Sequence, residues 1–293
     1  MKYSEPKLLI LGSAAAEGIP AYYCNCRVCR EAAAKGGREI RGRTSYNFGD
    51  VLQIDYGPDM LQAFQRFYPR LNNIRHLLIT HAHEDHLDPA ELWFRISGCS
   101  HIPEEAEPMV IHASEPAFEL IRRGMAPTMC GLKSRAEMLD RAHIAFHSIG
   151  PFEMFELPDI GATVRTFGAQ HALDLIPMLF LITMGGRTVF IGNDTGLLPE
   201  ATKNALKALS GKVHIDVVVL DDTAALGPGW PDSHMGAPVD LETFAAFDSW
   251  GLTDEKTVRV VNHFSHNGGA THGELCAFFE PKGIIVGYDG LEL

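Results

Sequence analysis

The sequence predicts one α/β domain built from stacked layers of strands and helices. Short apolar runs rich in branched residues alternate with segments of helical periodicity along the whole chain of 293 residues. This alternation is typical of sheets whose faces are covered by helices. The chain contains no low-complexity tract, no long linker and no repeat of fixed period. Residues 1–293 are therefore predicted to form a single domain.

Ten apolar runs are predicted as strands, several of them buried on both faces. They cover residues 7–11, 51–55, 76–80, 110–112, 163–167, 178–184, 188–191, 217–220, 258–261 and 283–287. Helical patterns occupy residues 59–67, 89–96, 115–123, 134–142, 198–209 and 241–250. Asp240 is the expected N-cap of the last helix. Residues 98–158 are the least regular part of the chain and form a possible cap insertion.

The composition of the chain limits the class of its partners. It is 46% hydrophobic and 21% charged, with a formal net charge of −12. No stretch reaches the ~18 to 20 apolar residues of a membrane span, so no membrane partner is expected. The acidic balance disfavours long nucleic acid, which is held by clustered Lys and Arg. A small anionic substrate is compatible with it, because bound metal ions supply positive charge locally.

The beginning and the cysteines of the chain bear on its location. The apolar run 8–11 imitates a signal peptide, but Glu5 and Pro6 interrupt the basic part and Gly12 and Ser13 end the run. A first core strand followed by a glycine turn explains these residues better. Three of the six cysteines lie within six residues. This crowding favours metal thiolates over disulfides, and hence a reducing, cytoplasmic location.

The strongest chemical signal follows the predicted strand 76–80. His81, His83, Asp85 and His86 lie within six residues, directly after a buried apolar run. A loop that leaves a strand can fold such close side chains onto one point, and imidazole and carboxylate suit Zn, Mn or Fe. The segment predicts a metal centre. The alternative is a polar surface loop with chance histidines, and the spacing argues against it.

Three later residues, His171, Asp194 and His263, each follow a predicted strand. Loops at the ends of strands can reach the same sheet edge. Any one of these residues alone would be better explained as a hydrogen-bonded structural residue. Their common position after strands, together with the first cluster, favours metal ligation.

The motif His-x-His-x-Asp-His, followed by His, Asp and His after later strands, resembles the metallo-β-lactamase superfamily over essentially the whole chain. The resemblance implies an αββα sandwich of two mixed sheets flanked by helices. It implies one metal held by His81, His83 and His171, and a second held by Asp85, His86 and His263, with Asp194 bridging them. Asp55 matches the early Asp-x-Gly turn of the superfamily and is expected to orient a ligand histidine.

Two branches of the superfamily are excluded by single residues. The β-lactamases proper carry a Cys where Asp194 stands here. The flavodiiron oxygen reductases carry a Glu where His83 stands.

The second chemical signal is the Cys-x-Cys-x-x-Cys spacing of Cys24, Cys26 and Cys29. Three thiolates at this spacing can occupy three corners of a tetrahedron, and His266 is the suggested fourth ligand of a structural zinc. Buried free cysteines are the alternative. The other three cysteines are predicted to be small hydrophobic residues; they are Cys99, Cys130 and Cys276.

This cysteine segment narrows the resemblance. Together with residues 12–15, Pro20, 262–266 and 287–292, it resembles the PhnP group of phosphoribosyl cyclic phosphodiesterases. Pyrroloquinoline-quinone biosynthesis protein B shares the cysteine segment but usually has a degraded metal motif, so the complete motif here favours hydrolysis. The resemblance places an active-site histidine at His234, for which an exposed loop histidine is the alternative. The interval between His86 and His171 is longer than in compact members, which leaves the substrate open.

These expectations describe a hydrolase with two catalytic metals (Zn or Mn) and one structural Zn. A metal-bridging hydroxide would attack the phosphorus of a small cyclic or nucleotide-like phosphodiester, with His234 and Asp85 as the catalytic residues and His234 protonating the leaving oxygen. The alternatives are a lactone, thioester or amide hydrolase, an RNA-processing nuclease, and a non-catalytic protein of quinone-cofactor biosynthesis. A homodimer is possible. No NAD or ATP site is expected.

Seven other histidines match no ligand position of the superfamily. They are His76, His101, His112, His143, His147, His214 and His272.

Overall fold

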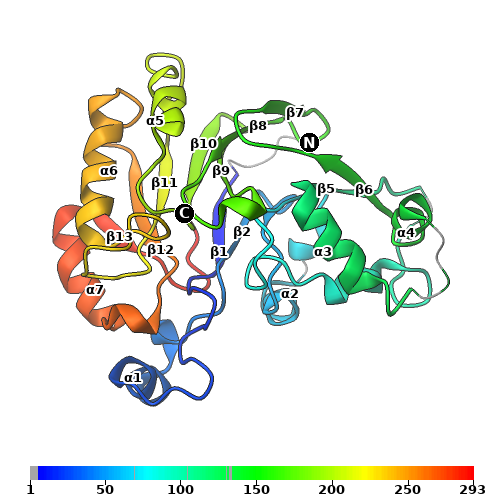
Figure 1. Ribbon diagram of the computed structural model, residues 1–293, viewed down its shortest axis with the longest axis horizontal. Helices are drawn as coiled ribbons and strands as arrows, with labels where there is room; N and C mark the ends of the chain where they lie inside the picture. Colours follow the sequence, from blue (N-terminus) through cyan, green and yellow to red (C-terminus); the bar gives the residue numbers. More distant parts are fainter. Residues whose placement is uncertain (1–5, 69, 104, 130, 132–133) are drawn as a thin grey trace.

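The computed structural model describes residues 6–68, 70–103, 105–129, 131 and 134–293, which form two sheets packed face to face with helices on the outer faces (Figure 1). The first sheet has the strand order β1-β2-β3-β4-β5-β6 and the second has the order β13-β12-β11-β10-β9-β8-β7. The αββα arrangement that the sequence predicts is confirmed.

The strands and helices have the following bounds. The first sheet contains β1 (Leu8–Gly12), β2 (Ser45–Phe48), β3 (Leu52–Ile54), β4 (His76–Leu78), β5 (Met109–Ala113) and β6 (Ile144–Ser148). The second contains β7 (Met154–Leu157), β8 (Ala162–Gly168), β9 (Met178–Met184), β10 (Arg187–Gly192), β11 (Val217–Asp221), β12 (Val258–Asn262) and β13 (Ile284–Val286). The α-helices are α1 (Arg27–Lys35), α2 (Met60–Phe67), α3 (Glu115–Met125), α4 (Arg135–Arg141), α5 (Glu200–Lys207), α6 (Ala237–Ser249) and α7 (His272–Phe279).

Both sheets are mixed, and their parallel parts determine where loops converge. Strands β3 to β6 run parallel, and so do β10 to β13, whereas β1 to β3 and β7 to β10 pair antiparallel. The carboxyl ends of parallel neighbours meet at one edge of a sheet, which is where open α/β sheets bind ligands. The loops after β4, β10 and β12 leave from such ends.

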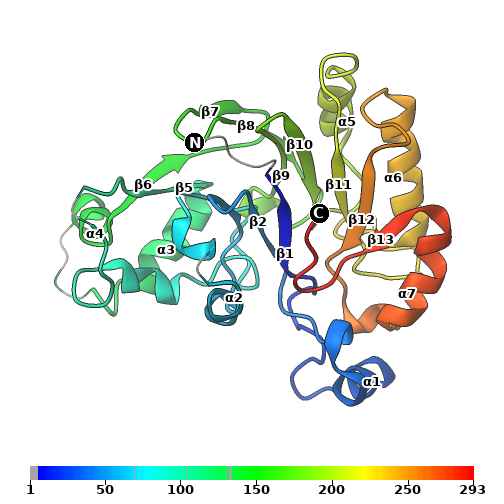
Figure 2. The ribbon, with the colours of Figure 1, turned by 180° about the vertical axis from the view of Figure 1, so that it is seen from behind.

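The core has layers that follow the pleat of the strands. Along β1, Leu8 and Ile10 pack between the two sheets, while Leu9 and Leu11 pack in a separate cluster with Met60 of α2. This alternation is expected of a strand covered on both faces. The helices α5, α6 and α7 lie against the second sheet, and α2, α3 and α4 lie on the side of the first (Figures 1 and 2).

All ten predicted strands are present, but β2, β6 and β7 were not predicted, and neither were α1 and α7. The segment Pro89–Arg95 forms a 3-10 helix. The prediction that Asp240 is an N-cap is wrong: α6 begins at Ala237 with Gly236 as its N-cap, so Asp240 is a buried residue of the first turn. Pro238 permits this earlier start, because the first turn of a helix needs no proline N–H.

The segment 98–158 supplies strands to both sheets. It contains β5 and β6, which extend the first sheet by parallel pairing, and β7, which pairs with β8 at the edge of the second. None of the helices among the described residues has the length and hydrophobicity needed to cross a bilayer.

Candidate metal centre

The loop after β4 is anchored by Asp55, the residue that follows β3. The Asp55 carboxylate accepts hydrogen bonds from Thr80 N at 2.8 Å, from Thr80 Oγ1 at 3.0 Å and from His86 Nδ1 at 2.7 Å. Thr80 Oγ1 lies 3.0 Å from His81 Nδ1. These contacts hold one nitrogen of each histidine and leave the Nε2 atoms of His81 and His86 free for a ligand. Asp55 therefore orients ligand candidates, as expected.

Three imidazole nitrogens converge on the first half of the site. His83 Nδ1 lies 2.9 Å from His81 Nε2 and 3.1 Å from His171 Nε2. The far nitrogen of His171 donates to the backbone oxygen of Ser233 at 3.2 Å. Burial and the neighbouring His86 hold the pKa of His81 well below its usual value. Three imidazole nitrogens that converge in this way form a ligand set for a divalent cation.

The second half of the site combines carboxylates with imidazoles. Asp194 Oδ2 lies 2.9 Å from His86 Nε2 and 3.0 Å from His263 Nε2, and Asp85 Oδ2 lies 3.1 Å from His86 Nε2. Although burial opposes charge on His86, the Asp194 and Asp85 carboxylates raise its pKa. Burial opposes ionisation of Asp85 and Asp194, but the neighbouring histidines lower the pKa of both carboxyl groups.

Three atoms of this second half show that the residues fit a metal ion. His86 Nε2, His263 Nε2 and Asp194 Oδ2 are buried and make no hydrogen bond, although Asp194 Oδ2 lies 2.9 Å from His86 Nε2 and 3.0 Å from His263 Nε2. Buried polar atoms are normally satisfied. Atoms that are close but not aligned on each other are aimed at a shared point, as metal ligands are.

Asp194 lies between the two halves. Its Oδ1 is 3.7 Å from His171 Nε2, while its Oδ2 contacts the second half. The residue has a left-handed φ of 54°, and its N–H donates to Asp221 Oδ2 at 3.0 Å. The structure thus brings all seven predicted ligands together, and we call them the edge site. Its members are His81, His83, Asp85, His86, His171, Asp194 and His263.

His234 lies beside the edge site. Its ring is 4.9 Å from the His171 ring and 5.6 Å from the His263 ring. Its Nδ1 lies 3.0 Å from Asp221 Oδ2, so Nε2 is the nitrogen available to a substrate. Burial opposes a charge on His234, but the adjacent Asp221 carboxylate outweighs burial and raises the pKa.

Sequence analysis missed the role of Asp221, the last residue of β11. Its carboxylate accepts from Asp194 N at 3.0 Å and Thr223 N at 2.9 Å, and it also holds His234. Thr223 in turn contacts His263 Nδ1 at 2.8 Å. The available signal was a carboxylate at the end of a fully apolar strand.

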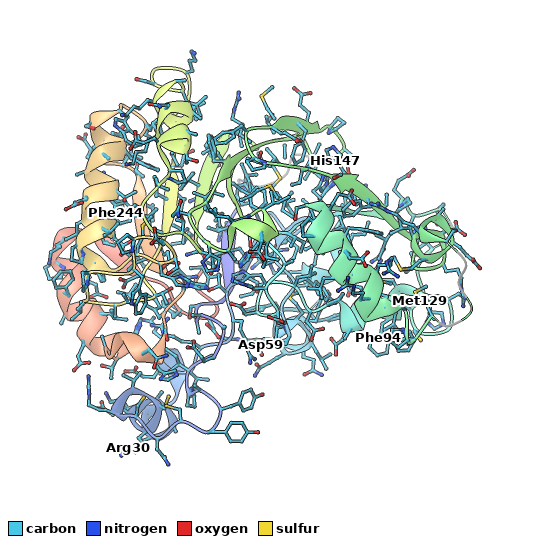
Figure 3. All side chains as sticks on the ribbon, viewed as in Figure 1. Arg30, Asp59, Phe94, Met129, His147 and Phe244 are labelled. Carbon is cyan, nitrogen blue, oxygen red and sulfur yellow. The ribbon has the colours of Figure 1, made fainter. Side chains whose placement is uncertain are left out.

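The cysteine cluster lies on a small lobe that carries α1 and projects below β1 and α7; Figure 3 labels Arg30 there. Cys24, Cys26, Cys29 and His266 place their ligand atoms within 4.8 Å of one another, and we call them the lobe site. His266 Nδ1 is 3.5 Å from Cys24 Sγ and 3.6 Å from Cys26 Sγ. Burial opposes ionisation of Cys26, yet hydrogen bonds from its neighbours lower its pKa to about 6. This donor set fits tetrahedral zinc.

The remaining histidines and cysteines among the described residues lie outside both clusters. His76, His112 and His147 form a hydrogen-bonded row across β4, β5 and β6. Cys99 is exposed, unlike the small hydrophobic residue predicted, and Cys276 contacts His272. The prediction for Cys130 falls outside the described residues.

Comparison with known proteins identifies the superfamily to which this fold belongs. The profile of the beta-lactamase superfamily domain matches residues 51–261, and the chain belongs to this superfamily of metallo-hydrolases. The solved structures of a diphosphatase from the PhnP family and of Zn²⁺-bound PqqB from Methylobacterium extorquens share its fold. For the first, identity is 20% and the TM-score 0.66, covering 98% of this chain and 96% of that chain. For the second, identity is 19% and the TM-score 0.64, covering 98% and 99%.

Two further similarities complete the comparison. The metallo-beta-lactamase fold protein YhfI from Bacillus subtilis has 16% identity and a TM-score of 0.65, covering 99% of both chains. An octanoyltransferase of Porphyromonas gingivalis is 33% identical over 85 residues, which are 28% of this chain and 16% of that protein. This chain therefore matches only a small part of that relative's length.

Proposed function

We propose that the protein is a phosphodiesterase with two divalent metals, Zn or Mn, in the edge site. The observation that carries the proposal is the set of buried, unsatisfied donor atoms on His86, His263 and Asp194. His81, His83 and His171 would hold one metal, and Asp85, His86 and His263 the other, with Asp194 between them. Metal ions bound there would acidify a water molecule and neutralise charge on phosphorus.

His234 is the proposed general acid. Its Nδ1 is held by Asp221 at 3.0 Å, which leaves a proton on Nε2 for the oxygen of the leaving group. Asp221 favours the protonated ring, because a carboxylate beside an imidazole stabilises its positive charge. Asp221 would therefore keep His234 both oriented and protonated until the leaving oxygen needs the proton.

The lobe site is proposed to hold a structural zinc. A tetrahedral site with four protein ligands has no open position for a substrate. The cysteine lobe would thus contribute to folding and not to the reaction.

The test combines metal content with substrate class. Protein stripped by a chelator is reloaded with Zn²⁺ or Mn²⁺, and hydrolysis of bis(p-nitrophenyl) phosphate is compared with that of a p-nitrophenyl thioester and a lactone. We expect metal-dependent hydrolysis of the phosphodiester at the highest kcat/KM. Full activity in the stripped protein would refute the metal mechanism. A preference for the thioester or lactone would support the alternative hydrolase.

A further inference from the structure

Three loops around His171 are bound to one another by backbone contacts. Gly196 N donates to Gln170 O at 2.9 Å, and Leu197 N donates to Pro231 O at 2.9 Å. His171 Nδ1 lies 3.2 Å from Ser233 O. The loops that follow β8, β10 and β11 are therefore joined by hydrogen bonds into one surface beside His171 of the edge site.

Each of these three loops exposes a large apolar side chain. Leu173 is 64% exposed, Leu197 46% and Trp230 48%, and we call these three residues the apolar rim. Leu173 follows His171 by two positions, and Leu197 follows Asp194 by three. The Trp230 ring lies 6.3 Å from the His234 ring. The three exposed side chains therefore flank the proposed ligands and general acid, where they can contact an apolar part of a bound substrate.

The same region has no cationic side chains of its own. The loops 79–88, 169–177, 193–199, 222–236 and 263–271, which carry the edge site and His234, contain no Lys or Arg. Arg43, whose Nε donates to Ala16 O near the His263 loop, is already paired with Asp59 at 3.0 Å. A second phosphate on a substrate would therefore meet no free cation from these loops, while each metal would already be engaged with the first.

We propose that the edge site hydrolyses phosphodiesters that carry a single negative charge and an apolar substituent, which packs on the apolar rim. This inference rests on the proposed phosphodiesterase function and narrows its substrate class. The occupant of the rim is the alkyl or aryl part of the substrate. A substituent with its own phosphate is disfavoured.

The first experiment varies the substituent and keeps the chemistry constant. Methyl, butyl and hexyl p-nitrophenyl phosphates share one leaving group, so only binding of the alkyl part differs among them. A fully buried methylene strengthens binding about fourfold, and kcat/KM should rise at least about tenfold from methyl to hexyl on a partly open rim. Calorimetry with monohexyl and monomethyl phosphate gives the same preference without turnover.

Variants connect that preference to the rim. Trp230→Ser and Leu173→Ser should flatten the rise of kcat/KM with alkyl length. The main-chain bond from Trp230 N to His234 O is kept in the first variant. Leu61→Ser is the matched control, because Leu61 is a 52% exposed residue of α2 outside these loops; it should keep the wild-type rise. A p-nitrophenyl phosphodiester whose butyl group ends in a phosphate should have a lower kcat/KM than the plain butyl diester. Leu197→Arg should reduce that difference in kcat/KM.

The outcomes separate this inference from the function on which it rests. Metal-loaded protein that hydrolyses none of the diesters refutes the proposed function, while calorimetry still reports whether hexyl binds better than methyl. Hydrolysis with no dependence on alkyl length refutes the apolar rim and leaves the phosphodiesterase in place. Light scattering that shows a dimer converted to monomer by Trp230→Ser, with the alkyl dependence unchanged, would make the rim a contact between two copies of the chain.

Discussion

The edge site and the lobe site are built in opposite ways. The edge site collects its ligands from loops after β4, β8, β10 and β12, so it exists only when both sheets are assembled. The lobe site takes three of its four ligands from six consecutive residues before and within α1. Ligands that come from distant strands are positioned by the assembled sheets. Ligands that are close in sequence are not, so a bound metal would contribute more to the folding of the segment that carries them.

Their surroundings differ accordingly. His86 and Asp194 of the edge site are almost fully buried and are held by Asp55 and Asp221. Cys24 and Cys26 of the lobe site are only half-buried, and α1 buries few residues of its own. We expect changes in the edge site to affect the reaction and changes in the lobe site to affect folding.

The largest effect is expected from Asp194→Asn. The amide keeps the size of the side chain but removes the charge that faces both halves of the edge site. Loss of a group around a ligand costs roughly 10- to 100-fold in affinity or activity, so loss of a residue proposed to bind both metals should lower kcat/KM by at least about 10³-fold. Metal analysis should find fewer edge-site ions and an unchanged zinc in the lobe. Retained activity and metal content would show that Asp194 is not a ligand.

The next largest effect is expected from His234→Ala. A positioned acid contributes typically about 10²- to 10⁴-fold, so kcat should fall by that factor with metal content unchanged. The loss should be smaller for a p-nitrophenolate leaving group, which needs little protonation, and larger for an alkoxide. Equal losses on both substrates would indicate stabilisation of charge in the transition state. Loss of metal would make His234 a ligand, which its proximity to Asp194 and His263 permits.

A more modest effect is expected from Asp221→Asn. The amide has one acceptor oxygen, so it keeps the bond from Asp194 N or the bond from Thr223 N but not both, and it no longer holds a positive charge on His234. We expect kcat to fall by roughly 10- to 100-fold, and the fall should be largest for alkoxide leaving groups. In a double variant with His234→Ala, the effect of Asp221→Asn should mostly disappear. If the two losses instead multiply, Asp221 acts on the metal ligands and not through His234.

Much of the fold and of the edge site could be predicted from the sequence. Apolar runs are local signals and predicted ten strands, whereas the two-sheet arrangement and the full set of seven ligands followed from the resemblance of the whole motif to the superfamily. The strands β6 and β7 escaped because they lie at sheet edges and are partly exposed, so they lack an apolar run. Helix α7 escaped although its capping box, Thr271 and Glu274, is visible in the sequence. Asp221 ends an apolar strand, but that signal does not identify its partners, because Asp194 and His234 reach it from two different loops only in the folded chain.

The smallest effect on the reaction, and the largest on folding, is expected from Cys26→Ser. Metal binding contributes to folding where the ligands lack a rigid scaffold. The variant should lose the lobe zinc and about 2 to 4 kcal/mol of stability, which lowers the melting temperature by roughly 5 to 10 °C. Its kcat/KM below the melting transition should stay within about threefold of wild type, since the lobe contains no edge-site ligand. Cys276→Ser, a cysteine outside the cluster, is the control and should keep its zinc. A Cys26→Ser protein with full zinc content and an unchanged melting temperature would show that the lobe site does not hold a structural zinc. A Cys26→Ser protein that melts normally but loses activity would show that the lobe site affects the reaction and not folding.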